Sequence, residues 1–226
     1  MKIKYLVTSL LLSAGLLIGC NNGGKQSSDD AELEYTQEQA TAKTKQLAQD
    51  QGFEVRIHVE ATDTGDDEDV NEDVQFGYTS EVFWMHEVGA YKKVEGGVEV
   101  YSYDEETHQY KGGYLTAGVD YDSTFATASI YLFTAYSYES MGFNFTSKKS
   151  VNFLGRAATE YTAAYAGAEG AATFALVVDN ETGMTLKVAA SGVDASGEGG
   201  SASFEVTMLK IGNDVEVPEL HKISLA

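Results

Sequence analysis

Residues 53–60 read FEVRIHVE, with an apolar side chain at every second position. Successive side chains of a β-strand point to opposite faces, so this alternation places the phenylalanine, the valines and the isoleucine on one face. The charged and polar residues share the other face. A strand of this kind belongs to an antiparallel sheet with one solvated side. His58 lies on the solvated side, so we expect it to have no ligand role.

The same period of two recurs along most of the chain. It predicts strands at residues 74–78, 82–88, 98–103, 109 onward, 153–165, 174–178, 184–188 and 204–208. The run Asp179-Asn-Glu-Thr-Gly183 separates two of these strands, and its glycine supplies the positive φ that a hairpin turn requires. Residues 82–88 are apolar on both faces, so we expect a further element to pack over the second face of that strand.

Two segments carry helical signals. Thr36 can cap a helix, with Gln39 completing a capping box and Gly52 ending the helix. Residues 123–138 contain no charged side chain and have apolar residues at helical spacing, which predicts a buried helix that covers the sheet. A pair of buried strands is the alternative for residues 123–138, because Thr, Tyr and Ile also favour strands.

The N-terminus has the features of a lipoprotein signal peptide. Lys2 and Lys4 precede an uncharged apolar run that ends in LIGC, residues 17–20. This ending resembles a bacterial lipobox, in which a diacylglyceryl group is attached to the Cys and the chain is cut just before it. We therefore expect residues 1–19 to be a signal peptide and Cys20 to be the lipid attachment point. A simple membrane anchor or an ordinary secretory peptide is the alternative.

The remaining chain divides into a linker and one domain. Residues 20–35 are small, polar and acidic, which is typical of a flexible tether, and residues 36–226 are long enough for a single domain with its own core. The formal net charge of −20 repels phosphate backbones and anionic headgroups, so nucleic acid is excluded as a partner. We expect a location in the cell envelope, outside the cytoplasm, with membrane attachment through the acyl chains on Cys20.

No residue pattern indicates catalysis or a cofactor. The sequence has no Gly-x-Ser-x-Gly elbow, His-Glu-x-x-His pair, P-loop or Gly-x-Gly-x-x-Gly turn, and its four histidines lie on separate predicted elements. Residues 63–73 hold alternating acids but lack the Gly and the terminal Glu of an EF-hand loop. We therefore expect no enzyme activity, no catalytic residue, no cofactor and no metal site, with weak calcium binding by residues 63–73 left open.

Three motifs resemble the LolA/LppX-like family of bacterial lipoproteins. They are Leu154-Gly155-Arg156 leading to Tyr161, the run from Val178 to Lys187 with Asp-x-x-Thr-Gly inside it, and the Phe204 strand leading to Val217-Pro218. The resemblance covers about residues 36–218. It implies an α+β fold, a curved antiparallel sheet (an incomplete barrel) with helices packed on its concave face. It also implies an apolar cavity between sheet and helices that binds acyl chains.

Two functions follow from these patterns. The first is a lipid-anchored protein that binds an apolar ligand, a lipid or acyl chain, in a cavity between sheet and helix. The residues expected to line that cavity are Trp84, Phe125, Leu132, Phe133 and Tyr136. The second is a structural or protein-interaction lipoprotein at the surface, with a filled core and no small-molecule ligand.

Overall fold

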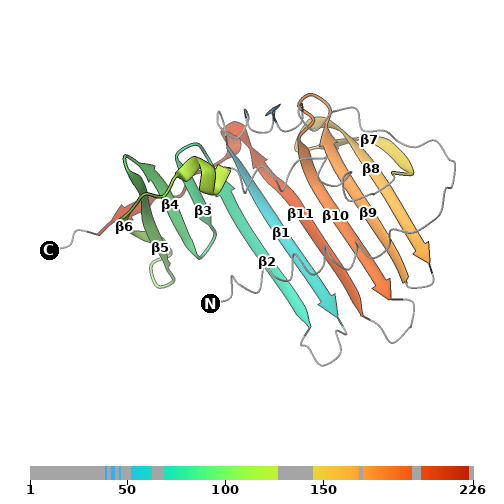
Figure 1. Cartoon of the computed structure of the whole chain (residues 1–226), viewed down its shortest axis with the longest axis horizontal. Helices are drawn as coiled ribbons and strands as arrows, with labels where there is room; N and C mark the ends of the chain where they lie inside the picture. Colours follow the sequence, from blue (N-terminus) through green and yellow to red (C-terminus); the bar gives the residue numbers. More distant parts are fainter. Residues whose placement is uncertain are drawn as a thin grey trace.

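The computed structural model describes residues 39, 42, 43, 46, 52–62, 69–126, 145–167, 170–194 and 200–223. Twelve strands in this part of the chain form one sheet, in the order β12-β6-β5-β4-β3-β2-β1-β11-β10-β9-β8-β7 (Figure 1). Neighbouring strands are antiparallel, except that β12 and β6 run parallel. Within the described ranges, no helix has the length and hydropathy needed to cross a membrane.

Strands account for nearly all of the regular structure. Their bounds are β1 (Phe53–Thr62), β2 (Val70–Tyr78), β3 (Val82–Met85), β4 (Gly89–Val94), β5 (Gly97–Asp104), β6 (Gln109–Ala117), β7 (Ser147–Phe153), β8 (Arg156–Gly167), β9 (Gly170–Asp179), β10 (Thr185–Asp194), β11 (Ser201–Ile211) and β12 (Leu220–Lys222). Two short helical elements are η1 (Asp122–Ala126) and η2 (Gly212–Asp214).

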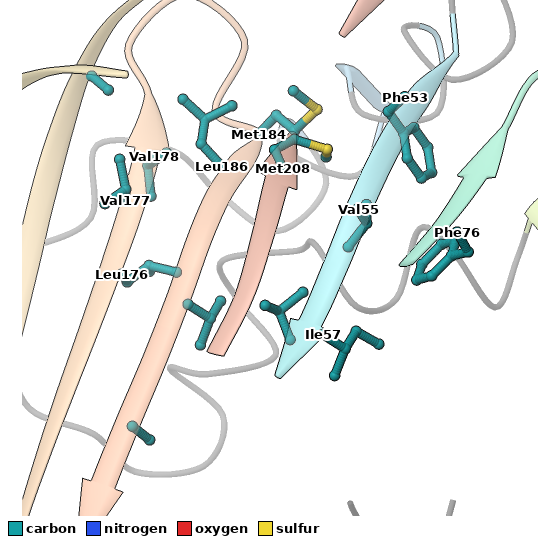
Figure 2. Packing of buried hydrophobic residues seen from close by; sticks show 14 of the residues in the cluster. Phe53, Val55, Ile57, Phe76, Leu176, Val177, Val178, Met184, Leu186 and Met208 are labelled. Carbon is teal, nitrogen blue, oxygen red and sulfur yellow. The ribbon is translucent and has the colours of Figure 1, made fainter. Parts of the chain in front are cut away.

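The main region of the sheet, β1, β2 and β7–β11, has one apolar face. Val55, Ile57 and Val59 on β1 are at most 7% exposed, as their alternation predicted. The register pairs Val55 with Met208 and Ile57 with Val206, so apolar side chains of neighbouring strands stand in rows on the same face. We call this side the apolar face, and Figure 2 shows several of its side chains packed together.

The opposite face of the main region is polar. Arg56 Nε on β1 donates to both carboxylate oxygens of Asp73 on β2, at 2.9 and 2.7 Å. Lys187 Nζ on β10 lies 2.6 Å from a carboxylate oxygen of Glu205 on β11. Ion pairs this exposed contribute at most about 1 kcal/mol each. They match the strand register but supply little of the stability.

The end region of the sheet, β3–β6 and β12, is apolar on both faces. Phe83 pairs with Tyr78 and continues the apolar face, whereas Trp84 pairs with Gly77 and stands on the opposite face. Trp84 is 1% exposed and belongs to a second core cluster. The other members are Val82, Ala90, Tyr101 and Tyr110, with Tyr103, Val215 and Leu220 packed against them. The second face of β3 is therefore covered, as its sequence predicted.

The predicted α+β class, with helices packed on the concave face of the sheet, is wrong. The helical residues among those described are η1, η2, Tyr121 and four exposed residues, 39, 42, 43 and 46. These are too few to form a helical layer. On the second face of the end region, the cover comes from the segment containing Val215 and Leu220, which has no α-helix.

Two further differences concern individual elements. The helix predicted over residues 123–138 begins with the helical backbone of η1, and residues 127–138 lie outside the described residues. Strands β4, β7 and β12 are present although the sequence analysis did not predict them. Strands β4 and β7 each contain two adjacent lysines, Lys92-Lys93 and Lys148-Lys149, which interrupt the alternation that identifies a half-buried strand. Strand β12 has only three residues, too few to show an alternation.

Candidate functional site

The candidate site is the apolar face of the sheet. One row of this face crosses five neighbouring strands, from β1 through β11, β10 and β9 to β8. The row consists of Ile57, Val206, Val188, Leu176 and Tyr161, each paired with the next. All five residues are at most 7% exposed. An unbroken apolar strip of this width is the structural requirement for holding an acyl chain or for packing a second layer.

An aromatic cluster lies at the β2–β4 side of the apolar face. The ring centroid of Phe125 on η1 is 4.8 Å from that of Phe83, 4.9 Å from that of Tyr91 and 5.3 Å from that of Tyr121. Tyr121 in turn stacks on Tyr78 at 5.9 Å. Ring pairs at these separations add to the stabilisation from burial alone. The cluster therefore anchors η1 on the apolar face.

Both buried tyrosines of this cluster have a raised pKa, and one of them donates a hydrogen bond. The Tyr121 hydroxyl donates to the backbone oxygen of Thr79 at 2.8 Å, and burial raises the pKa of this tyrosine. Burial, with a smaller contribution from Asp122, raises the pKa of Tyr78 to about 12. Lys93 Nζ lies 2.6 Å from Asp122 and 5.9 Å from the centroid of the Tyr121 ring. This arrangement holds the aromatic rings in place.

Phe145 occupies the other side of the apolar face. Its ring centroid is 5.5 Å from that of Tyr161 on β8 and 6.0 Å from that of Phe174 on β9. Phe125 and Phe145 therefore lie on the same face of the sheet, near opposite ends of the strand order. Residues 127–144, which connect them in sequence, lie outside the described residues.

The predicted site residues do not all lie together in the structure. Phe125 lies on the apolar face, whereas the Trp84 ring lies on the opposite face in the second core cluster. Leu132, Phe133 and Tyr136 lie outside the described residues. The partner of Phe125 on β3 is Phe83, one residue before Trp84. The alternation within residues 82–88 separates these two side chains, but only the pairing with β2 assigns each of them to a face.

The motifs that resemble the LolA/LppX-like family have a structural role here. The buried Asp179 carboxylate accepts backbone N–H bonds from Glu181 at 2.7 Å and Thr182 at 3.2 Å, and it also pairs with Arg156 Nε. Gly183 closes the turn with a φ of 71°. The Leu-Gly-Arg motif at the start of β8 and the Asp-x-x-Thr-Gly turn at the end of β9 are therefore joined by one buried ion pair. Their conformation is explained by turn formation without a ligand.

The remaining polar candidates form no evident site. His58 lies on the opposite face, with Nε2 3.5 Å from Glu60 and Nδ1 3.8 Å from Asp73. In the part of the chain that the structure describes, no group of three or more His, Cys, Asp or Glu side chains is placed to hold a metal ion. The acidic loop at residues 63–73 is described only from Asp69 onward.

Comparisons with known proteins give structural neighbours only. No family model and no curated protein matches the chain. A LolA superfamily protein from Nitrosomonas europaea has 11% identity and a TM-score of 0.22, over 81% of this chain and 96% of that one. A DUF1329 family protein from Desulfovibrio piger has 6% identity and a TM-score of 0.24, over 78% and 92%. A member of the LolA superfamily, which the sequence motifs resemble, is therefore among the neighbours, and scores this low carry no conclusion about activity or ligand.

Proposed function

We propose that this chain is a lipid-anchored protein outside the cytoplasm that binds an apolar ligand, a lipid or acyl chain, on the apolar face of its sheet. The observation that carries the proposal is the apolar row from Ile57 to Tyr161 across five strands, facing away from a polar side. A sheet face in contact with water can carry polar residues throughout. A continuous apolar strip therefore indicates a face that is not in contact with water. All five residues of the strip are at most 7% exposed in the chain itself, so the proposed ligand lies between the strip and the part of the chain that buries it.

The proposed anchoring rests on the N-terminal sequence. Residues 1–19 are proposed to be removed as a signal peptide, Cys20 to carry the lipid, residues 20–35 to form a tether and residues 36–226 to form the domain. All of residues 1–35 lie outside the described residues. Cys20→Ser should abolish acyl-label incorporation and shift the protein to the aqueous phase or leave it uncleaved. Unchanged detergent partitioning with label still incorporated contradicts the assignment.

The proposed ligand contacts are on the apolar side only. We propose that the ligand contacts Phe125 and three residues of the segment that follows it, Leu132, Phe133 and Tyr136. Trp84 is not part of this set, because its ring is buried against the other side of the sheet. No catalytic step is proposed for any of these side chains, since none of them activates a nucleophile or transfers a proton.

The alternative is an interaction lipoprotein with a filled core. The observation that favours it is the near-complete burial of the apolar row, where Leu176 and Val188 are 0% exposed. Close packing of this kind is typical of solid protein interiors. Partner binding would then use the outer surface and not the apolar face.

Ligand binding and stability separate the two functions. In delipidated protein, Leu132→Ala should lower the free energy of unfolding by less than about 2 kcal/mol and weaken the binding of a fluorescent fatty-acid probe. A ligand-facing side chain has fewer packing partners than a core side chain, for which truncation costs about 2–5 kcal/mol. Leu176→Ala is the matched control, because Leu176 is a fully buried residue of the sheet.

Mass spectrometry of an organic extract of the purified protein identifies the bound lipid directly. We expect a lipid that is released without cleavage of the anchor at Cys20. Core-like destabilisation by Leu132→Ala, together with no saturable probe binding by the wild type, contradicts the carrier function and leaves the interaction lipoprotein.

A further inference from the structure

The hairpin between β7 and β8 has a residue at its tip that turn formation does not explain. Phe153 pairs with Arg156, so Leu154 and Gly155 alone make the turn. Their φ angles are 50° and 73°. A two-residue turn with positive φ at both positions favours Asn, Asp or Gly. Leucine carries a steric cost in this left-handed region, so another residue at position 154 would form the same turn more easily.

Core packing does not explain the Leu154 side chain either, because the side chain is 46% exposed. A Cβ added at the neighbouring Gly155 would meet no heavy atom within 4 Å, so the tip projects away from the sheet. The other non-glycine residues with positive φ in the described part of the chain are Glu87 and His108, which are both polar. A strained position that presents an apolar side chain to solvent indicates a contact made outside the chain.

The charges of this hairpin differ from those of the rest of the chain. No Asp or Glu occurs between Glu139 and Glu160, whereas the same stretch holds three basic residues, Lys148, Lys149 and Arg156. Lys149 pairs with Glu160 on β8, and Arg156 pairs with Asp179 on β9. In a chain with a formal net charge of −20, this stretch is the one that lipid phosphates repel least.

The proposed lipid on Cys20 would keep the tip close to a bilayer. A flexible tether with the length of residues 20–35 spans about 20–25 Å on average. The domain then stays beside the membrane, where a projecting apolar side chain meets lipid at high effective concentration.

We propose that the β7–β8 hairpin is a membrane contact and that Leu154 inserts into the boundary between headgroups and acyl chains. The partner is the surface of the bilayer that carries the anchor. The proposal rests on the anchor at Cys20, but not on a ligand bound at the apolar face.

The test uses the full-length chain, purified with its anchor and reconstituted in vesicles of phosphatidylcholine and phosphatidylethanolamine. Leu154→Cys supplies a free thiol, because the thiol of Cys20 is blocked by its lipid, and a nitrobenzoxadiazole dye is attached to it. We expect blue-shifted emission and at least twofold quenching by lipids that are brominated near the top of their acyl chains. Val193→Cys is the matched control, since Val193 is 54% exposed and pairs with Ala171 and Ser201 at the other end of the strands. Its dye should emit as in water and escape quenching.

A second variant separates a membrane contact from a contribution to folding. Leu154→Asn should unfold at a higher urea concentration than the wild type in micelles, because Asn tolerates the left-handed region. A lower unfolding midpoint shows that Leu154 stabilises the fold, which overturns the proposal. Equal quenching at positions 154 and 193, or none at position 154 in protein with a lipidated Cys20, overturns the tip contact alone. Dye found on Cys20 by mass spectrometry contradicts the anchor on which the proposal rests.

Discussion

The main region and the end region of the sheet differ in whether the face opposite the apolar one is exposed to solvent or covered. On the face opposite the apolar one, the main region presents Arg56 and Asp73 to solvent, whereas the end region buries Trp84 beneath the segment containing Val215 and Leu220. One continuous sheet thus has a solvated half and a covered half on one side. Strand pairing is continuous across both regions. Whether a side chain on this face contributes to the core therefore depends on whether another segment of the chain covers it.

The largest expected effect is the loss of the covered indole. Trp84→Ala should lower the free energy of unfolding by about 3–5 kcal/mol, because it removes the largest side chain of the second core cluster. Urea unfolding followed by circular dichroism measures the change. A loss below about 1 kcal/mol would mean that the C-terminal segment does not form a core with the end region.

Gly77 gives an independent check on the same contact. A Cβ added at Gly77 would lie 2.0 Å from the Trp84 ring, so Gly77→Ala forces the indole to move. It should cost roughly 1–3 kcal/mol in the wild type. In a Trp84→Ala background the cost should largely disappear, because the atoms that clash are gone.

A smaller effect is expected at the hairpin that ends β9 in the main region. Asp179→Ala should lower the free energy of unfolding by about 3 kcal/mol, since Arg156 loses its buried partner and two backbone N–H groups lose their acceptor. Glu181→Ala is the control, because the Glu181 side chain is 88% exposed and lies 3.7 Å from Arg156. Equal effects of the two substitutions in urea unfolding contradict the role assigned to the buried carboxylate.

The boundary between the two regions should respond to alkaline pH. Burial raises the pKa of Tyr78 to about 12, above the value of about 10 in an unfolded chain. The neutral phenol therefore contributes stability that is complete below pH 10 and is lost as the pH rises through about 12. Tyr78→Phe should lose less stability than the wild type between these pH values. Parallel urea midpoints for both proteins across this range contradict the burial of the hydroxyl.

The smallest effect is expected on the solvated half of the opposite face. Arg56→Ala should change the free energy of unfolding by less than about 1 kcal/mol, because the Arg56 side chain is 42% exposed and its pair with Asp73 is screened by solvent. Added salt should reduce the effect further. A cost similar to that of Trp84→Ala shows instead that something covers this half as well, and the contrast between the regions then fails.

Local sequence was sufficient for most of the strands and for the hairpin between β9 and β10. The alternation at residues 53–60 predicted β1, and Asp179-Asn-Glu-Thr-Gly183 predicted the turn between β9 and β10. Both depend on residues that are neighbours in the chain, since side-chain period and turn chemistry act over a few positions. The same reasoning failed for residues 92–93 and 148–149, where adjacent lysines conceal the strands β4 and β7.

Only the tertiary structure decided which side chains lie on each face of the sheet and which of them are covered. The assignment of Phe83 to the apolar face and Trp84 to the other follows from pairing with β2, and the cover over Trp84 comes from residues more than a hundred positions away. The sequence therefore named Trp84 and Phe125 as candidates for one site but could not show that they lie on opposite faces of the sheet. Strand order and register bring distant residues together, and neither is encoded in a local period.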